Sequence, residues 1–138
     1  MRDQTNTAWW SLRIAFFVGP LVAGLDKFFR LLANWDQYLS PVAQRMLGSH
    51  SHQFMLAAGG VEILIAVLVI TRWTMLGAYL ASVWLFLMTV NVVMTGHYFA
   101  IALGNLGLCL SAFGLAKLSA ASEGEMLHVV PTEIRRAA

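Results

Sequence analysis

Glu62 is an acidic residue in the middle of a long apolar segment of the chain. An ionised carboxylate is strongly disfavoured in the hydrocarbon of a membrane, so Glu62 must be protonated, paired or hydrated. Asn105 is expected at a similar depth in another apolar segment and is the best neutral partner for Glu62. Lys27 and Asn91 are expected nearer to the outer membrane surface.

These four residues are predicted to edge a small pocket that opens to the outer leaflet. Such a pocket would suit a head group that both accepts and donates hydrogen bonds, such as a quinone. The alternative is a buried polar network that fixes the packing of the helices and binds no ligand. The sequence leaves both interpretations open.

Asp26 and Arg13 are further polar candidates on the first apolar segment. Asp26 precedes Arg30 by four residues, which is the favourable order for a helical ion pair and leaves Lys27 free for the interior. Arg13 shares one helical face with Gly24 and Lys27. We therefore count Asp26 and Arg13 among the candidate cofactor-binding residues.

Three histidines are expected on the outer face: His50 and His52 in a Ser-His-Ser-His sequence, and His97. Three imidazoles can bind zinc or copper. However, no carboxylate or thiolate completes a known pattern, so we predict solvated loop histidines and no metal site. No catalytic constellation can be read either, and we expect no enzymatic activity of the chain alone.

The elements that must position these residues are predicted from four apolar runs. Of the 138 residues, 59% are hydrophobic and 12% are charged, against roughly a quarter charged in soluble domains. The runs cover residues 9–32, 53–71, 74–96 and 98–118, and each is long enough to cross a bilayer as an α-helix. Short connections predict an all-α, up-and-down, four-helix transmembrane bundle in residues 1–119, followed by a short polar tail in residues 120–138.

Residues 33–52 are predicted to fold as a helix in the membrane interface between the first two spans. One apolar stripe supports this prediction: Trp35, Tyr38, Leu39, Val42 and Met46. Asn34 and Gln37 resemble a capping box. Alternatively, the element is broken in two, with a second short helix that begins at Ser40-Pro41 and is closed by Gly48.

Small and polar residues mark the faces where membrane helices meet. The predicted interior therefore includes Gly24, Gly59, Gly77 and Trp84, whereas Trp35 is interpreted as an interfacial anchor. A second line of small residues lies on the last span: Gly104, Gly107, Ser111 and Gly114. It predicts contact with other membrane-protein subunits or with a second copy of the chain.

The distribution of Lys and Arg predicts the orientation. Six of these residues lie at the N-terminal end of the predicted bundle and three at the opposite end, which favours both termini on the cytoplasmic side of a bacterial-type inner membrane. The net charge of +2 is too small to indicate a nucleic-acid partner. The expected surroundings are the lipid bilayer.

Three short motifs stand out in the apolar runs: Gly24-Leu25-Asp26-Lys27-Phe28-Phe29, Gly59-Gly60-Val61-Glu62-Ile63 and Asn105-Leu106-Gly107-Leu108. Together they resemble the DoxX-like family of small four-helix membrane proteins. The family takes its name from a small subunit associated with quinol oxidation in respiratory chains. The resemblance thus implies an accessory membrane subunit of a quinone-linked redox system, although family members often have a charged residue where this chain has Asn105.

Two other functions remain open from the sequence. Small proton-coupled transporters also combine four short helices with one membrane carboxylate, but their glutamate lies in the first helix and Glu62 lies in the second. A structural subunit that scaffolds a larger membrane complex would require only the small-residue faces of the last span.

Overall fold

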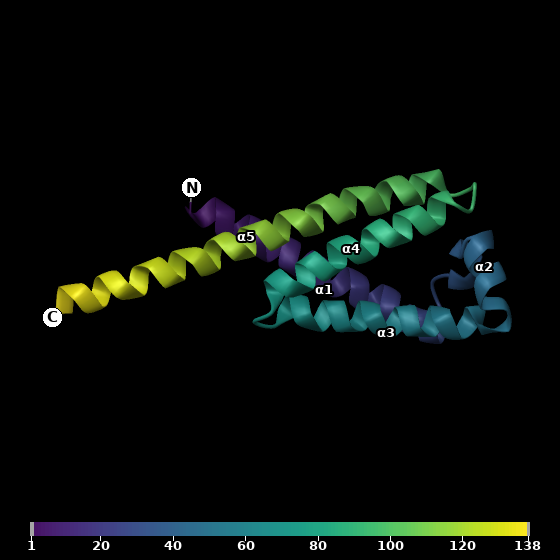
Figure 1. Ribbon diagram of the computed structural model, residues 1–138, viewed down its shortest axis with the longest axis horizontal. Helices are drawn as coiled ribbons and strands as arrows, with labels where there is room; N and C mark the ends of the chain where they lie inside the picture. Colours follow the sequence, from purple (N-terminus) through teal and green to yellow (C-terminus); the bar gives the residue numbers. More distant parts are fainter. Residues whose placement is uncertain (1, 138) are drawn as a thin grey trace.

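The computed structural model describes the backbone of residues 2–137 and the side chains of residues 4–122. Within this part of the chain every regular element is helical (Figure 1). The α-helices are α1 (Arg2–Phe29), α2 (Pro41–Leu47), α3 (Ser51–Ile70), α4 (Thr74–Val93) and α5 (Phe99–Ala137), with short 3-10 turns η1 (Trp35–Tyr38) and η2 (Gly48–His50). The all-α prediction is confirmed.

Four helical stretches are long and apolar enough to cross a membrane. They are Gln4–Phe29, Pro41–Ile70, Thr74–Val93 and Phe99–Ser122. Large apolar side chains are exposed along all of them, among them Ile14, Leu64, Val83 and Leu110, as expected of helices whose outer surface contacts lipid. The chain is therefore built as a multi-pass membrane protein, and α5 continues as a helix through the predicted polar tail to Ala137.

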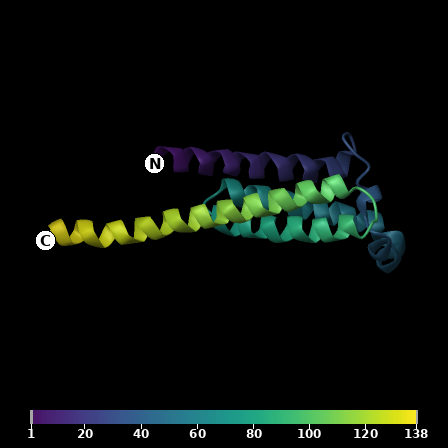
Figure 2. The ribbon, with the colours of Figure 1, turned by 90° about the horizontal axis from the view of Figure 1, so that it is seen from above.

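The four long helices form an up-and-down bundle, in which short turns join α3 to α4 and α4 to α5, whereas residues 30–50 connect α1 to α3. Helix α1 packs mainly against α3, and α4 packs mainly against α5 (Figures 1 and 2). We call the end with the start of α1 and the α3–α4 turn the N-terminal end, and the opposite end, which carries α2, the α2 end.

Two glycines set the distance between α1 and α3. A Cβ atom added to Gly24 would lie only 2.7 Å from the carbonyl oxygen of Gly59, and one added to Gly59 would lie 2.8 Å from the carbonyl oxygen of Gly24. Because no side chain separates them, the two backbones touch at this crossing. The prediction that both glycines face the interior is confirmed.

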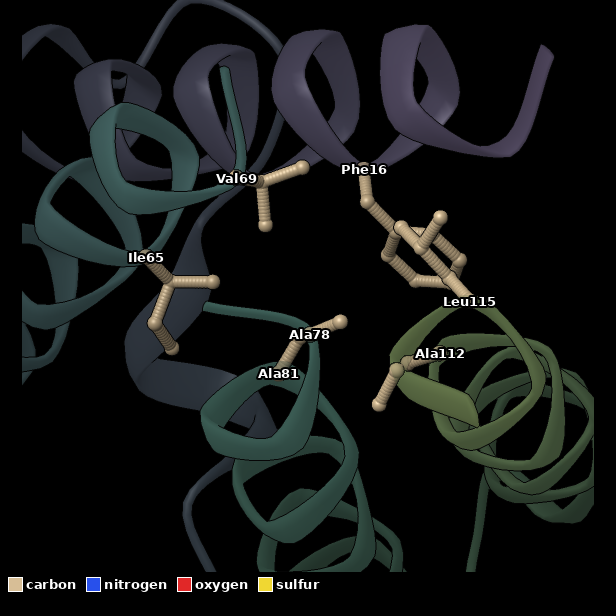
Figure 3. Close-up of a cluster of buried hydrophobic side chains, with 8 residues drawn as sticks. Phe16, Ile65, Val69, Ala78, Ala81, Ala112 and Leu115 are labelled. Carbon is tan, nitrogen blue, oxygen red and sulfur yellow. The ribbon is translucent and has the colours of Figure 1, made fainter. Parts of the chain in front are cut away.

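A dry apolar cluster fills the N-terminal half of the bundle (Figure 3). All four long helices contribute to it, and its buried members are Phe16, Ile65, Val69, Ala78, Ala81, Ala112, Leu115 and Ala116. Beside it, the indole Nε1 of Trp9 donates a hydrogen bond of 2.8 Å to the hydroxyl of Ser119, which joins α1 to α5. The helices thus converge closely in this half.

The segment between α1 and α3 is divided into two helical parts, η1 and α2, which confirms the second of the two predictions. The hydroxyl of Ser40 accepts a hydrogen bond from the Ala43 amide at the start of α2, and Gly48 ends α2 with a φ of 53°. The continuous helical stripe is wrong, because Leu39 and Ser40 have extended backbone conformations and separate η1 from α2. The capping box at Asn34 is also wrong, because its side chain makes no capping hydrogen bond.

Candidate functional site

An ion pair between α1 and α3 is the centre of the candidate site. The ammonium Nζ of Lys27 lies 2.6 Å from Oε2 of Glu62, and the two residues are only 1% and 7% exposed. Each lies three residues, close to one helical turn, beyond the glycine of its own helix at the Gly24–Gly59 crossing. The close approach of the backbones therefore brings a lysine and a glutamate together inside the bundle.

Two tryptophans complete the surroundings of the pair. The Lys27 ammonium lies 3.8 Å from the centre of the Trp35 ring, a cation–π contact. The indole Nε1 of Trp84 donates to Oε1 of Glu62 at 3.3 Å. Glu62 is thus paired, as one of its three predicted states requires, but with Lys27 and Trp84 instead of Asn105. The interpretation of Trp35 as an interfacial anchor missed this contact.

A cavity of about 420 Å³ adjoins the carboxylate of Glu62. Its walls are mainly apolar and come from all four long helices and η1. The wall residues include Gly19, Ala23, Trp35, Tyr38, Ile65, Trp84, Met88, Ile101, Asn105 and Leu108. Glu62 lies 8 residues before the end of α3, or ~12 Å along the helix at 1.5 Å per residue, so the cavity lies deep within the membrane-spanning part.

Asn105 and the backbone near Pro20 bring polar atoms to this cavity. The half-buried Asn105 lines the wall, and its side chain has no hydrogen-bond partner among residues 4–122. Pro20 lacks an N–H group, so the Phe16 carbonyl receives no helical hydrogen bond from it, and both residues line the cavity. The site therefore offers uncommitted donors and acceptors inside an apolar wall.

Asp26 acts at the end of α1 and does not form the predicted ion pair with Arg30. Its carboxylate accepts hydrogen bonds from the backbone amides of Leu31, Leu32 and Ala33 and from Nε1 of Trp35. Arg30 takes a left-handed φ of 54°, which ends α1 earlier than the predicted residue 32, and pairs with Asp36 instead. Asp26 thereby folds the chain back and fixes Trp35 against the cavity.

Asn91 fixes the other side of the same loop. Its side-chain amide donates to the Tyr38 carbonyl at 2.7 Å, and its side-chain oxygen accepts from the Ser40 amide at 3.0 Å. Tyr38 in turn contacts Tyr98 edge to face, with ring centres 5.0 Å apart. Asn91 and Asp26 are therefore positioning residues, which hold η1 across the α2 end of the cavity.

The structure does not bring Arg13 to this site. Its guanidinium donates to the carbonyls of Val69, Ile70 and Thr71 at the C-terminus of α3. Arg13 precedes Lys27 by 14 positions, ~21 Å along a helix, so a shared helical face does not imply a shared depth. Its role here is to satisfy the last carbonyls of α3 and the negative end of the helix dipole.

The histidines are spread over the α2 end of the molecule. His52 contacts Arg30 and lies 3.5 Å from Asp36, whereas the ring of His97 lies against Tyr98. Among residues 4–122 no three His, Cys, Asp or Glu side chains form a group that could hold a metal ion. Neither His50 nor the other two histidines lines the cavity.

We compared the chain with models of protein families, with curated proteins and with solved structures. None of the three comparisons found a match. The resemblance to the DoxX-like family therefore stays a prediction that is based on the short motifs alone, and the function has to be argued from the site.

Proposed function

We propose that this protein binds the head group of a membrane quinone and serves as an accessory subunit of a quinone-linked redox system, as a member of the DoxX-like family. The observation that carries the proposal is the cavity beside Glu62. A volume of about 420 Å³ lies within the usual range of small-molecule pockets, as does a mainly apolar wall with few polar groups.

The residues present fit the chemistry of such a head group. A quinone ring is apolar on its faces and carries two oxygens that take part in hydrogen bonds. The Asn105 amide can donate to a ring oxygen in the oxidised form and accept from it in the reduced form. Glu62 and the Phe16 carbonyl would accept hydrogen bonds from a ring hydroxyl, while Met88, Ile65 and the aromatic walls of the cavity would contact the ring.

The ion pair favours this proposal over proton-coupled transport. A proton-coupled transporter needs a membrane carboxylate that is accessible to protons, whereas both carboxylate oxygens of Glu62 are already engaged, by Lys27 at 2.6 Å and by Trp84 at 3.3 Å. We further propose that both termini lie on the cytoplasmic side of a bacterial-type inner membrane, because the N-terminal end carries six of the nine Lys and Arg residues.

The test is a native purification in mild detergent, followed by analysis of bound quinone and of associated proteins. The proposal expects quinone at about one molecule per chain and expects Asn105→Leu to reduce it strongly, while Ser111→Ala, outside the cavity on the same helix, leaves it unchanged. An isolated protein without quinone, or full retention of quinone by Asn105→Leu, would contradict the proposal. Proton flux in liposomes would favour the transporter, and a large complex without quinone would favour the scaffold.

A further inference from the structure

Packed elements lie at both ends of the cavity beside Glu62. Toward the N-terminal end, Phe16 of α1 packs with Leu115 of α5 in the buried cluster, and the Trp9–Ser119 hydrogen bond lies beyond them. Toward the α2 end, η1 lies across the cavity with Trp35 and Tyr38 in its wall. A ligand that approached along the membrane normal would meet packed side chains from either direction.

The long side of the cavity between α1 and α5 is different. Gly19 on α1 and Leu108 on α5 line the cavity and are also exposed on the outer surface, and a Cβ atom added to Gly19 would meet no atom within 4 Å. Figure 1 shows the reason, since α1 follows α3 and diverges from α5 toward the α2 end. We call this opening the α1–α5 slot and define it by Gly19, Ala23, Ile101 and Leu108.

We infer that the ligand enters the cavity sideways from the bilayer through the α1–α5 slot and keeps its hydrocarbon tail there when bound. This inference rests on the proposed function and adds the ligand class, an amphipathic molecule with a ring at Glu62 and Asn105 and a tail directed into lipid. The slot is lined only by apolar side chains, so a hydrocarbon tail can lie in it without removing water from any polar group. The polar residues that would bind the ring lie deeper in the cavity.

The size of the cavity argues against a helix of a second copy as the occupant. An α-helix about 10 Å across fills roughly 400 Å³ for every turn of 5.4 Å. The volume of about 420 Å³ would therefore hold about one turn and not a membrane span. A ring with the first part of its tail is of the right size.

The slot can be tested by equilibrium binding of two quinones to the purified protein in nanodiscs, with quinone concentrations expressed per lipid. One probe is a dimethoxy-methyl-benzoquinone with a ten-carbon tail, and the other is the same ring without a tail. Quenching of tryptophan fluorescence reports on both, because Trp35 and Trp84 line the cavity. The variants are Gly19→Leu in the slot and Gly104→Leu on the exposed surface of α5 outside the cavity, where a Cβ atom also meets nothing within 4 Å.

We expect Gly19→Leu to weaken binding of the tailed quinone by about tenfold or more, because the added side chain occupies the path of the tail. The ring without a tail should change by less than about threefold, and Gly104→Leu should change neither probe beyond that. A second pair of variants narrows the same slot from α5: Leu108→Trp in the slot and Leu110→Trp outside the cavity as its control. If one slot variant does not fold, the other pair still decides the test.

Equal weakening of both probes, an unchanged affinity for the tailed quinone, or the same effect in the control variants would each overturn lateral entry. In those three cases the wild-type protein still binds quinone, and the proposed function stands. If the wild-type protein binds neither probe, the proposed function fails together with the inference.

Discussion

The two halves of the bundle are held together by different interactions. In the N-terminal half, apolar side chains from four helices form one buried cluster (Figure 3). In the α2 half, α1 and α5 separate, and the close Gly24–Gly59 crossing and a small buried cluster of Leu39, Met55 and Ala58 are joined by an ion pair, two loop-holding side chains and aromatic rings. Lipid gives helices little reason to associate, so the second half needs polar interactions to stay assembled around an open space.

The largest expected effect is in the α2 half, at Lys27. Removing one member of a buried ion pair leaves an uncompensated charge, so Lys27→Met should cost about 3–5 kcal/mol of stability. The double variant Lys27→Met with Glu62→Leu should recover most of the loss. Unfolding in mixed micelles or by steric trapping measures both, with exposed Lys117→Met as the control; a double variant as unstable as the single one would contradict the pairing.

In the N-terminal half the corresponding change is Leu115→Ala. It removes fully buried contacts and should cost about 2 kcal/mol, the low end for such truncations, because lipid is as apolar as the interior. Leu110→Ala, at a site that is mostly exposed, serves as the control. Quinone binding should be retained in Leu115→Ala, and a loss of binding without unfolding would show that the two halves are not separate.

Asn91→Ala should loosen the loop that covers the cavity and leave the dry cluster intact. Two hydrogen bonds to Tyr38 and Ser40 are lost, which should cost about 1–3 kcal/mol locally. Hydrogen exchange should become faster in residues 31–40 and stay unchanged around Val69. Asn34→Ala, whose side chain makes no capping hydrogen bond, is the matched control; an exchange pattern like that of the wild type would argue against a holding role of Asn91.

The smallest effect is expected at the surface of the α2 end. Arg30 and Asp36 form a partly exposed ion pair at 2.7 Å, and exposed pairs contribute about 0–1 kcal/mol. Asp36→Asn should therefore change the free energy of unfolding by less than about 1 kcal/mol, and salt should reduce the difference further. A loss as large as that of Lys27→Met would mean that the exposed charges, and not the buried pair, hold this half together.

The membrane spans and their contact faces could be predicted because they follow from free-energy costs that depend on single residues. Unsatisfied backbone groups in lipid require helices, and the close crossing of helices requires residues such as Gly24 and Gly59. The shelter of Glu62 also follows from a local cost, that of a charge in hydrocarbon. None of these arguments depends on how a loop folds.

The partners of the polar residues could not be predicted in the same way. A count of helix positions places Lys27 nearer to the outer membrane surface than Glu62. The long Lys27 side chain nevertheless spans this difference in depth and reaches Glu62. Asp26 has the right spacing for Arg30, but the backbone turn at residues 30–33 gives its carboxylate three amides instead. Arg13 lies on the same face of α1 as Lys27. However, it lies next to the C-terminal end of α3 and therefore donates hydrogen bonds to the carbonyls there.

The most direct measurement is infrared difference spectroscopy of the protein in bilayers at neutral pH, with Glu62→Gln and Lys27→Met compared with the wild type. If Glu62 is sheltered as the partner of Lys27 beside the cavity, Glu62→Gln removes bands of an ionised carboxylate, and Lys27→Met shifts those bands. A protonated Glu62 in the wild-type protein, or bands that do not respond to Lys27→Met, would contradict the ion pair on which the site depends.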